Sequence, residues 1–157
     1  MRFFEDIVIG DKREIGSYTF NAPDIKTFAA RFDPQLFHMD EEAAARSHFG
    51  KLVASGWHTA AMWMRLMVEY RKREADRLRA LGSPVPTIGP SPGFRNLNWS
   101  LPVYVGDTVS YASDVVETRL SNSRPGWGLM TVRNSGTNQN GKPVMSFFST
   151  GFVGRRT

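Results

Sequence analysis

A long helix whose two halves differ in character constrains the fold of this chain more than any other feature. The helix begins at Ser55 or Gly56 and ends near Leu81. Its first half is apolar around nearly its whole circumference, so it must be buried on most sides. Its second half, Glu69 to Arg79, mixes charges of both signs, which predicts a solvated helix face. The apolar run is too short and too polar to span a bilayer.

Residues of the first half are expected to fill the core of the protein rather than to bind a ligand. They are Met62, Trp63, Met64 and Met67. The second half offers several arginines, and loops elsewhere contribute Arg95 and Arg124. Any of these cations is a candidate for binding a phosphorylated small molecule.

Alternation of apolar and polar residues later in the chain predicts the sheet that covers this helix. The four strand candidates are Phe94 to Leu101, Thr108 to Leu120, Trp127 to Thr137 and Pro143 to Val153. Short turns such as Gly106-Asp107 and Asn140-Gly141 separate them, which predicts an antiparallel meander. A first strand is predicted within residues 3–20. One early strand, a buried helix and four later strands predict an α+β fold in which a curved sheet wraps the helix.

Shorter elements precede the long helix. The spacing of apolar residues predicts a helix from Pro23 to Phe32, and Pro34 ends it. A second short helix is expected from Asp40 to Arg46, with acidic residues in its first turn. The four prolines and three glycines between Gly82 and Gly93 predict an extended loop without a helix or a central strand.

Composition narrows the class of protein. A chain of 157 residues is near the usual size of one domain, so we expect a single domain over residues 1–157. There is no cysteine, which excludes disulfides and thiolate chemistry. The acidic start lacks the apolar stretch of a signal peptide, so a cytoplasmic protein is expected. The net charge of +5 favours an anionic partner, but the basic residues do not follow a nucleic-acid-binding pattern.

Two short segments carry residues suited to proton chemistry. Asp33 and His38, five residues apart, offer an acid/base pair, with His38 expected in a turn. Ser55-Gly56 offers a helix start whose free N–H groups can hold negative charge on oxygen. Taken singly, Asp33 is an ordinary residue at a helix end and Ser55 an ordinary N-cap. The three histidines lie ten residues apart, which is not a metal-ligand spacing, and no metal is expected.

The series Asp33, His38, Ser55-Gly56-Trp57-His58-Thr59 and Pro102 to Thr108 resembles the MaoC-like dehydratases, which include the R-specific enoyl-CoA hydratases. The resemblance extends over most of the chain. It implies a hot-dog fold, a homodimer or dimer of dimers, and an acyl-CoA substrate of fatty acid metabolism with no further cofactor. The hydratase motif usually has Asn and Pro between its Asp and His, whereas this chain has Pro34-Gln35-Leu36-Phe37 there.

The resemblance also implies roles for individual residues. Asp33 and His38 would be the catalytic acid and base, and the Gly56 N–H would bind the thioester carbonyl. Gln35, Ser55 and Trp57 would contact the substrate. The predicted reaction is the reversible hydration of a 2-enoyl-CoA to a 3-hydroxyacyl-CoA.

Other functions remain open at this point. The first alternative is an acyl-CoA thioesterase, although the first acidic residue of the long helix, Glu69, lies far along it. The second is a non-catalytic acyl-CoA-binding module, which the altered turn between Asp33 and His38 keeps open. A nucleic-acid-binding protein comes last.

Overall fold

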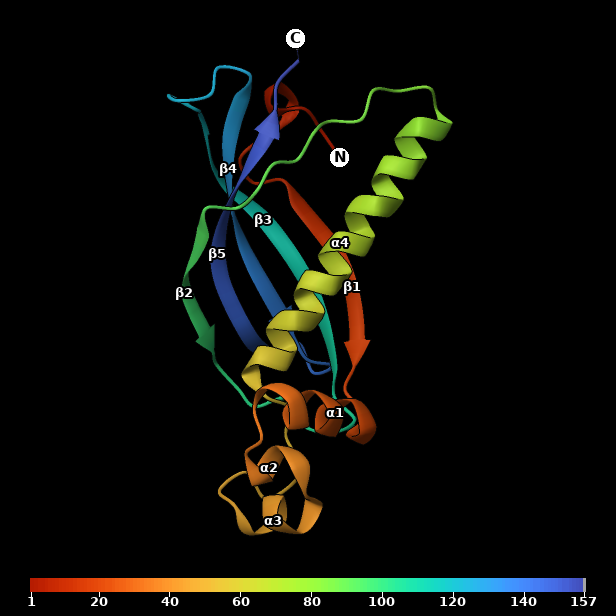
Figure 1. The fold of residues 1–157 in the computed structure, drawn as a ribbon, viewed down its shortest axis with the longest axis vertical. Coiled ribbons are helices and arrows are strands. Elements are labelled where there is room, and N and C mark those ends of the chain that lie inside the picture. The colour runs from red at the N-terminus through yellow and green to blue at the C-terminus, as the bar shows by residue number, and fades with distance from the viewer. Residues whose placement is uncertain (157) are drawn as a thin grey trace.

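The computed structural model describes residues 1–156, in which an antiparallel sheet curves around a long helix (Figure 1). The strand order is β1-β3-β4-β5-β2. In chain order the elements are a 3₁₀ turn at Phe4–Asp6, β1 (Lys12–Thr19), α1 (Ala22–Phe32), α2 (Leu36–Met39), α3 (Glu41–Arg46), α4 (Gly56–Ala80), β2 (Gly93–Trp99), β3 (Thr108–Leu120), β4 (Trp127–Thr137) and β5 (Pro143–Gly154). This is the arrangement of the hot-dog fold, and the predicted α+β class is confirmed.

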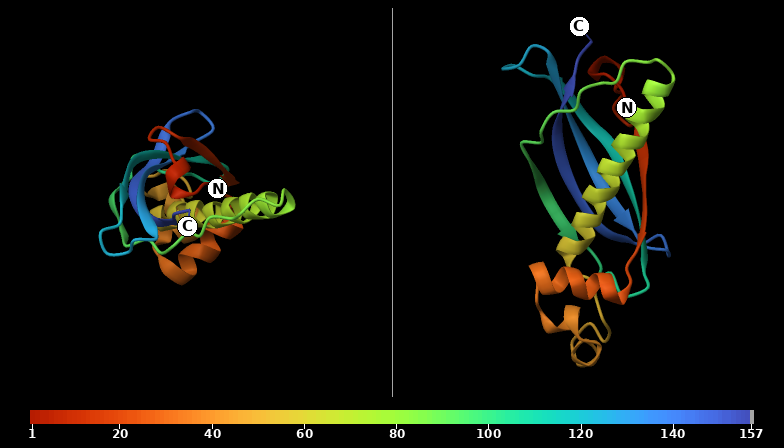
Figure 2. Two further views of the ribbon diagram at one scale, coloured as in Figure 1. Left: turned by 90° about the horizontal axis from the view of Figure 1, so that it is seen from above. Right: turned by 45° about the vertical axis from the view of Figure 1, so that its right-hand side comes forward.

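Helix α4 lies in the concave face of the sheet, which curls around it when viewed from above (Figure 2). Trp63 is 6% exposed and packs edge-to-face on Phe147 of β5, with ring centroids 4.7 Å apart. Tyr111 of β3 is buried and donates its hydroxyl to the carbonyl oxygen of Thr59 at 3.0 Å. Burial of these aromatic rings joins the helix to the sheet, and the hydrogen bond satisfies the polar end of Tyr111.

One stripe of the first half of α4 contradicts the expectation that it is buried on most sides. Trp57, Met64 and Val68 are 53%, 53% and 56% exposed. The stripe is exposed because the sheet wraps only one side of the helix. Met64 is therefore not core filler, whereas Trp63 and Met67 are buried as predicted. No helix within residues 1–156 has both the length and the apolar character needed to cross a bilayer.

The sheet departs from the predicted meander at β2. Strands β3, β4 and β5 follow one another as expected, but β2 pairs with β5 rather than with β3. The Gly106-Asp107 turn is not a hairpin, because the Gly106 N–H donates to the carbonyl of Phe20, beyond β1. Residues 103–105 instead pair with residues 52–54, below the start of α4. The first strand, predicted within residues 3–20, spans Lys12–Thr19 and pairs with β3.

Three short helices, α1 to α3, gather at the N-terminal end of α4 (Figure 1). The side chain of Asn21 caps α1 by accepting from the Asp24 N–H at 2.9 Å, and Asp40 caps α3 in the same way. His38 lies in the single-turn helix α2 rather than in an open turn. Gln35 and Asp40 are the residues that flank this helical turn. These helices carry the candidate acid/base pair to the start of α4.

Candidate active site

Asp33 and His38 are brought together beside the start of α4. His38 Nε2 lies 3.3 Å from Asp33 Oδ2, and the imidazole is buried. His38 Nδ1 lies 2.7 Å from the carbonyl oxygen of Val53. A carbonyl only accepts, so Nδ1 must carry a hydrogen and donate it there. This bond fixes the ring and leaves Nε2 to exchange protons with Asp33 and with a bound molecule.

The Asp33 carboxylate is held by hydrogen bonds on both oxygens. Ser55 Oγ donates to Oδ2 at 2.7 Å, and Gln35 Nε2 donates to Oδ1 at 2.8 Å. Burial acts to raise the pKa of Asp33, but these bonds and the neighbouring His38 outweigh it and hold that pKa below its usual range. Asp33 is therefore an ionised carboxylate at neutral pH, able to accept a proton. Gln35 thus contacts Asp33, and its expected contact with the substrate stays a prediction.

The start of α4 is capped as predicted. Ser55 Oγ accepts from the Trp57 N–H at 3.2 Å while it donates to Asp33, so one hydroxyl links the helix to the acid/base pair. Among the described residues the Gly56 N–H has no hydrogen-bond partner. Together with the positive end of the helix dipole, it offers a site for an oxygen that gains negative charge.

The space over the Gly56 Cα, where a side chain would project, is occupied. Trp99 of β2 covers it, and its Nε1 donates to the Gly56 carbonyl at 2.9 Å. A Cβ added to Gly56 would lie 2.5 Å from Trp99 Cε2. Glycine is needed because the indole packs directly on the helix start. Nothing in the sequence pattern places Trp99 there, since it follows from the pairing of β2 with β5.

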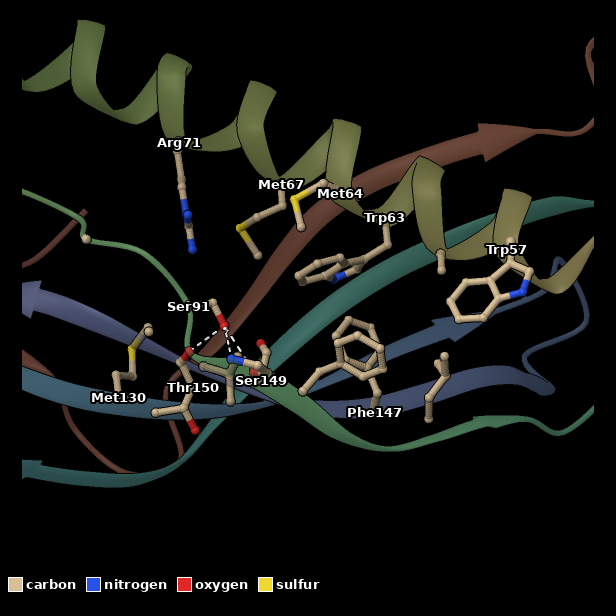
Figure 3. Close-up of a pocket in the computed structure, with 17 residues that line it drawn as sticks. Trp57, Trp63, Met64, Met67, Arg71, Ser91, Met130, Phe147, Ser149 and Thr150 are labelled. Atoms are coloured by element: carbon tan, nitrogen blue, oxygen red, sulfur yellow. Dashed lines mark hydrogen bonds between the residues drawn. The ribbon is translucent and has the colours of Figure 1, made fainter. Parts of the chain in front are cut away.

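Two cavities meet at Trp57. The first, of about 470 Å³, is lined by Asp33, His38, Ser55 and Gly56. The second, of about 340 Å³, runs between α4 and the sheet and is mostly apolar (Figure 3). Trp57 lines both, and its ring lies edge-on to Trp99 with centroids 5.1 Å apart. The two cavities are therefore neighbours, and a molecule with its reacting centre at Asp33 would pass Trp57 to reach the second one.

Comparison with known proteins places these features in a family. The sequence profile of the MaoC like domain matches residues 6–138. The chain belongs to the MaoC-like family. A MaoC-like dehydratase from Rhodospirillum rubrum is 37% identical, covers 100% of this chain and 99% of its own, and superposes with a TM-score of 0.82. The R-hydratase PhaJ1 from Pseudomonas aeruginosa shares the fold, with 21% identity, a TM-score of 0.71 and coverage of 98% and 86%.

A curated relative matches over a shorter stretch. The uncharacterized protein YdeM of Bacillus subtilis (strain 168) is 37% identical over 65 residues, which are 41% of this chain and 46% of that protein. The match thus spans less than half of YdeM. Membership of the MaoC-like family and the structural neighbours together support an enzyme of the hydratase or dehydratase type.

The second cavity of this MaoC-like domain was not foreseen in detail. The loop between Gly82 and Gly93 forms one wall through Gly89 and Ser91, and β2 contributes Phe94. Arg71 was expected on a solvated helix face, but its side chain points from α4 into the cavity (Figure 3). The mixed charges of this segment do not distinguish Arg71 from its neighbours in the sequence. Only the position of the sheet shows that Arg71 faces inward.

The remaining candidates lie away from Asp33. His58 is buried against Phe28, with stacked rings 4.6 Å apart, and His48 packs on Phe49. Arg95 lies over the ring of Phe148, as Arg124 does over Phe152. In the part of the chain that the structure describes, no three His, Asp or Glu side chains are grouped to hold a metal ion.

Proposed function

We propose that this protein catalyses the reversible hydration of a 2-enoyl-CoA to a 3-hydroxyacyl-CoA. The observation that carries the proposal is the contact between Asp33 and His38, 3.3 Å apart, on a cavity that also meets the start of α4. Hydration needs a base for water, an acid for the α-carbon and a donor for the thioester oxygen. These groups converge on one cavity here, and family membership supports the same chemistry.

The proposed steps give each group a distinct role. The Asp33 carboxylate takes a proton from water as the water oxygen bonds to the β-carbon. The thioester oxygen, which gains the negative charge, is held by the Gly56 N–H. In this scheme His38 starts as an imidazolium beside the Asp33 carboxylate, with one proton on Nδ1, donated to Val53, and one on Nε2. It gives the Nε2 proton to the α-carbon, which completes the hydroxyacyl product and leaves a neutral imidazole. Asp33 then passes its proton to His38 across their contact, which restores both groups. Dehydration follows the same steps in reverse.

Hydrolysis of the thioester is less well supported by the geometry. The acidic side chain on the inner part of α4, Glu69, pairs with Arg65 at 3.1 Å on the exposed side of the helix. Thirteen residues separate it from Gly56, or about 20 Å along the axis. It is therefore out of reach of a thioester held at the helix start.

We also propose that the protein forms a homodimer, or a dimer of such dimers. Strand β2 is at the edge of the sheet and has mostly exposed side chains, among them Phe94 at 59%. Met64 and Val68 of α4 are exposed as well. An open strand edge beside apolar side chains favours pairing with a second copy. Light scattering coupled to size-exclusion chromatography measures the mass, and a monomer at micromolar concentration would contradict this part of the proposal.

The activity is tested by following the absorbance of the enoyl-thioester band with crotonyl-CoA and longer 2-enoyl-CoAs. Loss of the band, with a 3-hydroxyacyl-CoA found by mass spectrometry, is the expected result. Release of free CoA thiol would show a thioesterase. Binding of acyl-CoA without any conversion would show a binding module.

A further inference from the structure

The cavity beyond Trp57 has apolar walls but contains hydrogen-bond donors that find no acceptor within residues 1–156. These are the Arg71 guanidinium, the Trp63 indole N–H and the Ser149 hydroxyl (Figure 3). A purely hydrocarbon ligand would leave all of them unsatisfied, and each buried unsatisfied group destabilises the complex. The cavity is therefore suited to a ligand that carries an acceptor.

Arg71 differs from the other cations of α4 because, within residues 1–156, it has neither an ion pair nor a hydrogen bond to the protein. Arg73, which also has no ion pair, donates to the carbonyl oxygen of Ile15 at 3.3 Å. Lys72 and Arg79 both pair with Asp76, at 3.0 and 2.8 Å, and Arg77 pairs with Glu74 at 3.1 Å. No carboxylate among residues 1–156 forms an ion pair with Arg71. Burial lowers its pKa, and the like charge of Arg13 lowers it further. A half-buried guanidinium whose named charged neighbour is another cation is suited to binding an anion.

Trp63 supplies a second donor. Its side chain is 6% exposed, and its Nε1 has no hydrogen-bond partner in the described chain. The ring lies between Trp57 and Arg71 along the cavity (Figure 3). Most buried indole N–H groups find an acceptor, so this one indicates that the cavity receives a polar atom from outside the chain.

Ser149 is made a donor by the residues behind it. Ser113 Oγ donates to Asn134 Oδ1 at 2.5 Å, and Asn134 Nδ2 donates to Ser149 Oγ at 2.9 Å. Because Asn134 donates to that oxygen, the Ser149 hydrogen is left for another acceptor, and none lies within residues 1–156. Ser91, in contrast, donates to the protein's own carbonyl groups. The row of polar residues thus orients Ser149 as a donor on the cavity wall.

The length of the cavity fits an extended chain. Fifteen residues of α4 separate Gly56 from Arg71, about 22 Å along the axis. Helical side chains lean toward the N-terminus, so the guanidinium lies somewhat closer to Asp33 than this. The walls between the two ends are largely apolar, with Met67, Phe94 and Phe147 among them. This arrangement matches a long hydrocarbon chain with an anionic group at its far end.

We propose that the preferred substrate is an acyl thioester whose chain ends in a carboxylate, which Arg71 and Ser149 bind at the end of the second cavity. The inference rests on the proposed function, because it places the thioester end of the same molecule at Asp33. It makes Arg71 a specificity residue: the residue selects the chain end and takes no part in the proton transfers.

The test compares matched pairs of 2-enoyl-CoAs of equal chain length, one ending in a methyl group and the other in a carboxylate. For medium and long chains, the carboxylate-ended substrate is expected to have a kcat/KM about tenfold or more above its methyl-ended partner. Arg71→Met keeps an apolar stem and is expected to remove or reverse this preference. Ser149→Ala is expected to reduce it by a smaller factor. Arg79→Met, on the exposed side of the same helix, is the matched control and is expected to retain the preference.

Calorimetry with the corresponding saturated acyl-CoAs and with free CoA separates the possible failures. Tighter binding of the carboxylate-ended chain by the wild type supports the proposal even if no thioester is hydrated, in which case only the hydration proposal fails. Equal binding and equal turnover of both chain ends would overturn the carboxylate site and leave hydration standing. If Arg71→Met weakened free CoA as much as any acyl-CoA, Arg71 would bind the CoA phosphates and the proposal would also be wrong.

Discussion

The two cavities that meet at Trp57 differ in whether the protein itself supplies hydrogen-bond partners for their polar groups. In the cavity of Asp33, each carboxylate oxygen accepts from a protein donor, and His38 is anchored by a backbone carbonyl. In the cavity of Arg71, the donors face a space that holds no acceptor from the described residues. The first arrangement fixes geometry before any ligand binds. The second arrangement requires the ligand to supply a hydrogen-bond acceptor.

The contrast separates reaction from selection. Prearranged hydrogen bonds suit groups that must hold one protonation state and one orientation during a reaction. Unsatisfied donors suit groups that distinguish one ligand from another, because a ligand without the matching acceptor leaves them buried and unsatisfied. Variants of residues in and beside the first cavity test this comparison. His58, whose buried Nδ1 belongs to neither cavity, provides a further case.

The largest effect is expected from Asp33→Asn, which removes the proton acceptor of the first cavity. The amide keeps the shape of the carboxylate, so the fold should be retained while kcat falls by about 100-fold or more. The enoyl-thioester assay measures the loss, and circular dichroism checks the fold. Asp40→Asn is the matched control, because asparagine caps a helix as well as aspartate does. Normal turnover by Asp33→Asn would remove Asp33 from the mechanism.

Gly56→Val tests whether the packing of Trp99 requires a glycine at the start of α4. The new side chain collides with the indole, so the free energy of unfolding should fall by about 1 to 3 kcal/mol, together with turnover. Urea unfolding measures the first quantity. Trp99→Leu in the same chain should recover part of the loss. If the double variant lost the sum of the two single effects, the collision would not be the cause.

His58 supplies a case of a buried nitrogen without a cavity. Its Nδ1 has no partner within residues 1–156, and burial lowers its pKa to about 4 against the pull of the Asp24 carboxylate. Below about pH 6.5, His58 is protonated in the unfolded chain, whereas it stays neutral in the folded chain until the pH approaches 4. The free energy of unfolding should therefore fall by about 2 kcal/mol from pH 7 to pH 5. Urea titrations at both values, with His58→Phe as the variant that lacks this contribution, measure the difference.

The smallest effect is expected from Ser55→Ala, which loosens the prearranged cavity without removing either proton carrier. Loss of the cap should lower the free energy of unfolding by about 1 kcal/mol. Loss of the hydroxyl also removes a bond that holds the pKa of Asp33 down, so that pKa should rise. The acid limb of the pH–activity profile should then move to higher pH, and an unmoved limb would contradict the role of Ser55.

Local patterns predicted much of the fold and of the first cavity. The alternation of residues over Thr108–Leu120 and Trp127–Thr137 matches β3 and β4 in both bounds, because neighbouring strands bury one face of each. Asp33, Gln35 and Ser55 do lie together, which agrees with the common site that the resemblance to the MaoC-like family implied.

Features that depend on distant pairing were not predictable from such patterns. The turn at Gly106-Asp107 has the residues of a hairpin, and only the bonds to Phe20 show that β2 lies elsewhere. Trp99 over Gly56 and the inward direction of Arg71 both follow from where β2 and the sheet come to rest. In each case the local sequence allows two environments, and tertiary packing decides between them.

Because β2 lies at the edge of the sheet, its local opening can control solvent access to the second cavity. This strand is bonded on one side only, its pairing with β5 is interrupted between Arg95 and Asn98, and most of its side chains are exposed. Segments of this kind open locally at a lower free energy than the rest of a domain. Where a second copy does not cover this edge, the backbone amides of β2 should therefore exchange their hydrogens sooner than those of β4. Because Phe94 and Leu97 line the second cavity, each opening of β2 also uncovers it to solvent, without unfolding of the sheet.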